Sequence, residues 1–131
     1  MLIVLIVDDN EAVRFFHSFI ITESKLSAEP LSFSSSMEAI DYLDQNSNKT
    51  DSYLILLDIN MPVMNGWDLM GAINDKSYCN QVQIVIVTSS VDRADHEKAI
   101  LYPMVIDFVE KPISAEECKR VMNFPSVAQY F

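Results

Sequence analysis

The sequence is poor in cysteine and in basic residues, and it contains no long apolar run. Its two cysteines, Cys79 and Cys118, are too few and too far apart for a disulfide framework or a zinc site. Nine basic residues against nineteen acidic ones give a formal net charge of −10. This balance argues against nucleic-acid binding, because little basic surface is available to replace phosphate counterions. No apolar stretch approaches the roughly 20 residues that span a bilayer.

The first residues lack the basic segment of a signal peptide, and the apolar run from Leu2 to Val7 leads directly into Asp8 and Asp9. We therefore expect a cytoplasmic protein that does not bind membranes. Half of the 131 residues are hydrophobic, which is enough apolar material to fill one core. Because no repeat, low-complexity tract or linker is present, we expect residues 1–131 to form a single domain.

Short apolar runs alternate five times with segments of helical periodicity. The expected strands cover about residues 2–7, 29–33, 53–57, 82–87 and 105–109. The expected helices cover about residues 11–22, 34–44, 67–74, 92–102 and 114–123. In the second of these, the serines at 34–36 supply the N-cap hydroxyl. This alternation predicts an α/β fold with a parallel sheet and helices on both faces.

Apolar positions indicate a packing face in several of the expected helices, such as the one at about 67–74, where Leu69, Met70 and Ile73 are expected to pack inward. In the first helix, one face carries Ala12, Phe15, Phe16, Phe19 and Ile20. In the last helix, the positions expected to be buried are Ala115, Cys118 and Met122. This helix must end before Pro125, because proline and the residue before it disfavour helical continuation.

Four of the apolar runs end in polar residues. The first is followed by Asp8 and Asp9, the third by Asp58, the fourth by Thr88, and the fifth by Glu110 and then Lys111. Because the carboxyl ends of parallel strands meet at one edge of the sheet, we expect these side chains to converge there. Three carboxylates in one crevice repel one another unless a cation neutralises them. Oxygen ligands without histidine or cysteine select a hard ion such as Mg²⁺.

Such a constellation favours phosphoryl transfer onto Asp58. A carboxylate beside Mg²⁺ can attack an incoming phosphoryl group, and Lys111 and Thr88 can contact its oxygens. Taken singly, each residue also has an ordinary structural interpretation. The acidic pair Asp8 and Asp9 could cap the following helix, and Asp58 could be a turn residue. Thr88 could bond to the backbone, and Lys111 could be a solvated charge.

Together, these residues resemble the receiver domain of two-component response regulators over essentially the whole chain. The matching motifs are Asp8-Asp9, Asp-x-x-Met-Pro-x-x-x-Gly from Asp58 to Gly66, Thr88 and Lys111-Pro112. The resemblance implies a flavodoxin-like, doubly wound sheet of five parallel strands in the order 2-1-3-4-5.

The resemblance also implies a role for each site residue. Asp58 would be the phosphoacceptor, Asp9 would bind Mg²⁺ directly, and Asp8 would bind it mainly through water. The backbone carbonyl of Asn60 would supply a further ligand. Lys111 would contact the phosphoryl group, and its peptide bond to the following proline would be cis.

A conformational switch is a further implication of the resemblance. Thr88 would move toward the phosphoryl group, and the Phe108 ring would turn inward to fill the space. Phenylalanine has no hydroxyl, so the two positions of this ring should differ by packing and not by a hydrogen bond. Asn60 and Ser90 would flank the phosphoryl group, at positions that tune how fast the acyl phosphate hydrolyses.

The expected partners are a histidine kinase or phosphotransfer protein as phosphodonor, and a downstream protein target, since no output module follows the last helix. The tail from Phe124 to Phe131 is expected to fold over the domain, with an interface role as the alternative. We expect a switch and not a turnover enzyme, with catalysis of its own phosphorylation and dephosphorylation left open.

Two alternative functions remain at this point. An aspartyl-phosphate hydrolase uses similar chemistry, but that class requires Asp-x-Asp after the first strand, and here Asn10 follows two residues after Asp8. The other alternative is a binding module whose relic site is not phosphorylated.

Overall fold

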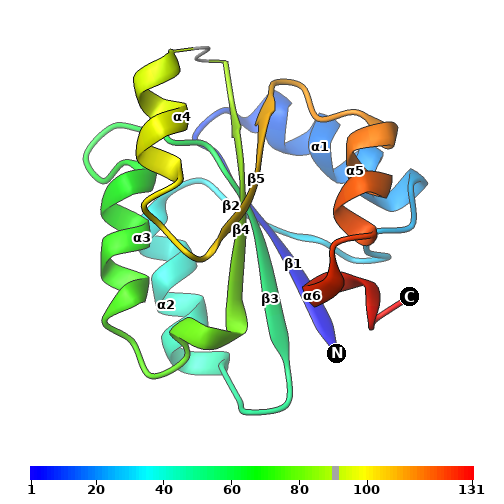
Figure 1. Ribbon diagram of the computed structural model, residues 1–131, viewed down its shortest axis with the longest axis horizontal. Helices are drawn as coiled ribbons and strands as arrows, with labels where there is room; N and C mark the ends of the chain where they lie inside the picture. The colour runs from blue at the N-terminus through cyan, green and yellow to red at the C-terminus, as the bar shows by residue number, and fades with distance from the viewer. Residues whose placement is uncertain (90–91) are drawn as a thin grey trace.

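The computed structural model describes residues 1–89 and 92–131, and a five-stranded parallel sheet forms its centre (Figure 1). The strands are β1 (Leu2–Val7), β2 (Leu31–Phe33), β3 (Ser52–Leu57), β4 (Val82–Thr88) and β5 (Val105–Glu110). They lie in the order β2-β1-β3-β4-β5, and all neighbours are parallel. The predicted doubly wound α/β fold and its strand order are therefore confirmed. Ser90, expected near the site, lies outside the described residues.

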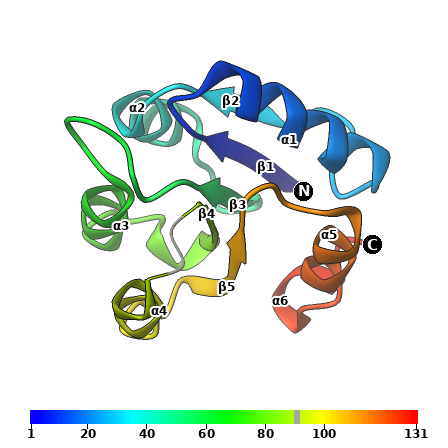
Figure 2. The ribbon, with the colours of Figure 1, turned by 90° about the horizontal axis from the view of Figure 1, so that it is seen from above.

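Helices cover both faces of the sheet (Figure 2). One face is covered by α1 (Glu11–Glu23) and α5 (Ala115–Met122), with α6 (Pro125–Ala128) beyond them. The other face is covered by α2 (Ser36–Asn46), α3 (Gly66–Asn74) and α4 (Arg93–Ala99). A short 3-10 turn, η1 (Cys79–Gln81), precedes β4. No helix among the described residues has both the length and the apolar composition needed to cross a membrane.

Each face of the sheet carries its own apolar core. In β1, Leu5 and Val7 belong to the core under α2 and α3, whereas Val4 and Ile6 belong to the core under α1 and α5. Successive side chains of a strand point to opposite faces, so a strand covered on both sides must be apolar throughout. Each fully buried leucine or isoleucine contributes about 1.5 to 3 kcal/mol relative to exposure.

Side-chain caps fix where most helices begin. The side chains of Asn10, Ser35, Asn65 and Ser114 accept hydrogen bonds from backbone N–H groups in the first turns of α1, α2, α3 and α5. Such caps each contribute about 1 kcal/mol. Because most of these helices directly follow strand-end loops, the caps also fix the loops that carry the polar residues.

The predicted packing face of α1 is wrong except for Ile20, which is partly buried against the core. Phe15, Phe16 and Phe19 are 78%, 44% and 55% exposed, while His17 and Ile21 are buried. Two hydrogen bonds to backbone groups outside the helix accompany this rotation. Arg14 Nη1 donates to the carbonyl of Asp8 at 2.7 Å, and the His17 ring accepts from the backbone of α5's preceding loop. Periodicity located an apolar stripe, but a different stripe of the helix faces the sheet.

Smaller differences concern element lengths and the last helix. Strand β2 begins at Leu31, two residues later than predicted, and α4 ends at Ala99, three residues earlier. In α5, Cys118 is buried as expected, but Ala115 is exposed and Val121 takes an inward position.

The tail folds back over the domain, as the sequence predicted, and includes the unpredicted helix α6. Its Val127 side chain is fully buried. The hydroxyls of Tyr130 and Ser52 lie 2.6 Å apart, and Ser126 Oγ donates to the Gln83 side chain at 3.1 Å. These contacts place the tail beside the first residues of β3 and β4, at the opposite end of the strands from Asp58.

Candidate functional site

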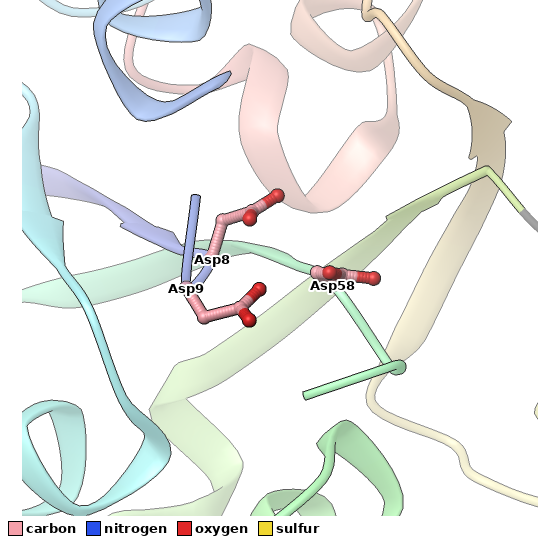
Figure 3. Close-up of side chains that lie close together, drawn as sticks. All are labelled: Asp8, Asp9 and Asp58. Atoms are coloured by element: carbon pink, nitrogen blue, oxygen red, sulfur yellow. The ribbon is translucent and has the colours of Figure 1, made fainter. Parts of the chain in front are cut away.

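Three aspartates meet at the carboxyl edge of the sheet (Figure 3). Val7 of β1 pairs in register with Leu57 of β3, so Asp8 and Asp58 leave neighbouring strands at the same level. Ligand oxygens of Asp8, Asp9 and Asp58 all lie within 4.8 Å of one another. Asp8 and Asp58 are buried, whereas Asp9 is exposed. The site is therefore an acidic cluster with two buried carboxylates and a third that is exposed.

Lys111 bridges the two buried carboxylates. Its Nζ lies 2.7 Å from Asp8 Oδ2 and 3.1 Å from Asp58 Oδ2, and its side chain is 17% exposed. Three ionised carboxylates and one ammonium group give this cluster a formal charge of −2, which matches a divalent cation. The oxygen-only donor set fits a hard ion such as Mg²⁺.

Burial and hydrogen bonding act in opposite directions on these groups. Burial raises the pKa of the Asp58 carboxyl, although the Asn60 backbone N–H and Lys111 partly oppose this change. Burial alone would lower the pKa of Lys111, but its hydrogen bonds to Asp8 and Asp58 raise it above the ordinary value. The lysine is thus held in its charged form, while the buried Asp58 carboxylate gains from any further cation.

Backbone N–H groups orient the two buried carboxylates. Asp8 Oδ1 accepts from the backbone of Asn10 at 2.9 Å, and Asp58 Oδ1 accepts from the backbone of Asn60 at 3.1 Å. Lys111 contacts the other oxygen, Oδ2, of each carboxylate. Both carboxylates are therefore fixed by one loop N–H and one ammonium group.

The loop between β3 and α3 holds Asp58 by close packing. A Cβ on Gly66 would lie 2.7 Å from Ile59 Cα and 3.0 Å from the Asp58 carbonyl oxygen. The Gly66 backbone N–H also donates to the Ile59 carbonyl at 3.1 Å. In the same loop, Val63 is fully exposed and has a φ of 67°, which is strained for a β-branched residue. Sequence reasoning noted Gly66 as part of a motif but did not single out Val63.

Thr88 and Lys111 lie at the ends of adjacent strands. The Lys111 backbone N–H donates to the Thr88 carbonyl at 2.9 Å, and the peptide bond between Lys111 and Pro112 is cis. The Thr88 side chain is buried, and its Oγ1 accepts from Asn60 Nδ2 at 3.3 Å. Asn60 therefore contacts the Asp58 carboxylate through its backbone and Thr88 through its side chain.

Phe108 lies further from the edge but on the same face of the sheet as Thr88. In register it pairs with Ile86, two residues before Thr88 on β4, and it packs against the core under α2 and α3. Side chains two residues apart on a strand share a face. The half-buried Phe108 therefore lies on β5, on the same face of the sheet as Thr88 on the adjacent strand β4.

Two α1 residues support the site without belonging to any motif singled out in the sequence. Arg14 holds the Asp8 backbone, as described above. His17 is buried, and its Nε2 accepts from the Ile113 backbone at 3.4 Å. Burial lowers the pKa of His17, an effect that Asp8 opposes and Lys111 reinforces. Arg14 and His17 lie one and two helical turns after the Asn10 cap, and this spacing is the feature of the sequence that could have placed them near the site.

The chain is similar to known proteins over nearly its full length. The response regulator receiver domain family matches residues 4–123. Chemotaxis protein CheY1 of Helicobacter pylori is 30% identical over 120 residues, which cover 91% of this chain and 92% of that protein. A solved two-component response regulator from Cytophaga hutchinsonii is 30% identical, with a TM-score of 0.84 and coverage of 94% and 95%.

A solved CheY-like receiver domain protein from Methanospirillum hungatei gives a similar result, with 32% identity, a TM-score of 0.72 and coverage of 92% and 90%. Two other curated relatives are longer, and this chain spans 5% and 32% of their lengths. The family match, the strand order and the acidic cluster at the sheet edge agree with one another. The chain belongs to the response regulator receiver domain family of two-component signalling.

Proposed function

We propose that this receiver accepts a phosphoryl group on Asp58 in a Mg²⁺-dependent reaction and thereby changes its affinity for a protein partner. The observation that carries the proposal is the cluster in which Asp8, Asp9 and Asp58 offer oxygens within 4.8 Å of one another while Lys111 bridges two of them. Its formal charge of −2 and its oxygen donors suit one divalent cation, and Lys111 offers a further positive charge to an incoming phosphoryl group.

Each residue has a separate task in the proposed reaction. Asp9, Asp8, Asp58 and the Asn60 carbonyl would hold Mg²⁺, which when bound offsets the negative charge of the transferring phosphoryl group. An Asp58 oxygen forms the new O–P bond as the N–P bond to the donor histidine breaks, and the departing imidazole takes up a proton. Lys111 leaves Asp58 Oδ2 to contact a phosphoryl oxygen.

The change at Asp58 would reach the surface through Thr88 and Phe108. Thr88 would turn its hydroxyl toward the phosphoryl group, which exchanges its contact with Asn60 Nδ2 for a new one. The Phe108 ring, on the same face, would then turn into the space left behind. We further propose that the phosphodonor is a histidine kinase or phosphotransfer protein, and that another protein reads the result.

The hydrolase alternative is less well supported than phosphoryl acceptance. It needs a second acidic side chain two residues after Asp8, but the side chain at that position, Asn10, accepts from the Val13 N–H as a helix cap. An amide neither gains nor loses a proton at neutral pH, so it cannot act as the general acid or base. If the protein is instead a binding module that is not phosphorylated, no phosphoryl adduct should form with any donor. The experiment below therefore tests this alternative too.

Intact mass spectrometry after incubation with Mg²⁺ and acetyl phosphate tests the proposal. We expect one phosphoryl adduct per chain in the wild type and none in Asp58→Asn or when EDTA removes the metal. Asp41→Asn, at an exposed aspartate of α2, is the matched control and should behave as wild type. Phosphate release that survives Asp58→Asn would instead favour the hydrolase, and no adduct with any donor would favour the binding module.

A further inference from the structure

A histidine of helix α4 is stacked on the switch phenylalanine of β5. The ring centroids of His96 and Phe108 lie 3.7 Å apart with an interplanar angle of 30°. His96 is exposed and Phe108 is half-buried, so the pair lies at the surface. Both side chains line a cavity of about 210 Å³ together with Ala99 and Ile100 of the α4 segment and Val105 of β5. A ring that turned away from this position would lose the stack.

Helix α4 is held to its neighbours mainly by surface contacts and buries little apolar surface. Of its seven residues, Arg93–Ala99, only Ala99 is buried. Lys98 Nζ lies 4.6 Å above the ring of Trp67 on α3, and that ring also contacts Tyr102. The His96 stack adds a direct link from α4 to Phe108. Elements with little buried apolar surface are those that shift most easily.

Hydrogen bonds and shared positions on the sheet connect the stack to Asp58. Asn60 donates from its backbone to Asp58 and from its side chain to Thr88. Thr88 and Phe108 share one face of the sheet on adjacent strands. His96 then covers Phe108 from the outside. A change at the carboxylate therefore has a physical route to α4.

We propose that His96 is a positioning residue of the switch, whose stacked ring holds Phe108 at the surface in the unphosphorylated state. When Phe108 turns inward, the stack breaks and α4 loses one of its attachments. This inference rests on the proposed function. An aromatic contact of this kind changes a conformational equilibrium by about 2- to 12-fold. A ligand that requires the inward ring must overcome that factor, so its apparent affinity is reduced by the same amount.

Beryllium fluoride with Mg²⁺, an acyl-phosphate mimic, is the probe for this effect. Titration of ¹⁵N-labelled protein followed by NMR should show that His96→Ala binds the mimic about 2- to 12-fold more tightly than wild type. His96→Phe keeps a stacking ring and should bind as wild type does. Glu97→Ala removes an exposed neighbour from the same helix, together with its exposed ion pair to Arg93, and is the matched control. A simple loss of structure would weaken binding, which is the opposite direction.

Hydrogen exchange without any phosphoryl mimic tests the stack independently. The α4 amides of His96→Ala should exchange faster than those of Glu97→Ala and His96→Phe. If His96→Ala binds the mimic as wild type does, or if His96→Phe changes as much as His96→Ala, the inference is wrong while the proposed function stands. If wild type itself does not bind the mimic, the proposed function fails, and equal exchange in all variants would also refute the stack as an attachment of α4.

Discussion

The two glycines of helix α3 should respond in opposite ways to the same substitution. A Cβ at Gly66 would lie 2.7 Å from Ile59 Cα and 2.9 Å from its Cγ2, closer than real Cβ contacts come. The clash is with backbone, and the Gly66 N–H is bonded to the Ile59 carbonyl, so a flexible side chain cannot relieve it. A Cβ at Gly71, in contrast, meets nothing within 4 Å.

The expected magnitudes follow from these contacts. Overpacking of this kind costs about 1 to 3 kcal/mol, so Gly66→Ala should lower the melting temperature by roughly 3 to 12 °C. Gly71→Ala lies in an exposed helix interior and should raise the free energy of unfolding by up to about 1 kcal/mol. Because the displaced backbone carries Asp58, Gly66→Ala should also bind Mg²⁺ more weakly. Thermal unfolding and Mg²⁺ titration of both variants measure these effects.

The comparison within one helix separates packing from helix propensity. Both substitutions replace glycine by alanine, and neither glycine has the positive φ that favours glycine. If Gly66→Ala is as stable as Gly71→Ala, the close approach of α3 to the Asp58 loop is not a constraint, and the reasoning is refuted.

Three further changes test other parts of the structure. Asp58→Asn should be more stable than wild type without Mg²⁺, because burial raises the pKa of Asp58 and disfavours its charge; equal denaturant midpoints would contradict this. Burial lowers the pKa of His17 below the ordinary 6.5. The stability that neutral His17 provides is therefore fully present above pH 6.5 and decreases as the pH falls below that value. His17→Gln should lose this pH dependence in denaturant titrations at pH 5 to 7, and an unchanged slope would argue against it. Val63→Asn should raise the free energy of unfolding by about 1 kcal/mol, since asparagine tolerates the left-handed backbone and Val63 buries nothing; a loss of stability would disprove this strain.

The sheet and the position of the site could be predicted because buried parallel strands leave a clear pattern. Strands β1, β3 and β4 are almost wholly apolar, so the polar residue at or directly after the end of each one marks the edge of the sheet. Asp8, Asp58 and Thr88 occupy those positions. The pattern depends only on local sequence and on the rule that parallel strands end on the same side.

The rotation of α1 could not be predicted in the same way. Periodicity identifies an apolar stripe, but Phe15 and Phe19 are exposed, while Arg14 and His17 bond to backbone groups outside the helix. The stack of His96 on Phe108 also joins two different elements, and no spacing within either one indicates it. Contacts between elements require the packed structure.

The central claim is that Asp58 carries the phosphoryl group. Borohydride reduction of the phosphorylated protein converts an aspartyl phosphate to homoserine, and peptide mass mapping then locates the converted residue. We predict homoserine at position 58 in the sample treated with Mg²⁺ and acetyl phosphate, and none in the sample that also contains EDTA. Homoserine at Asp8 or Asp9, or unconverted Asp58 in a protein that carries the phosphoryl mass, would contradict the account.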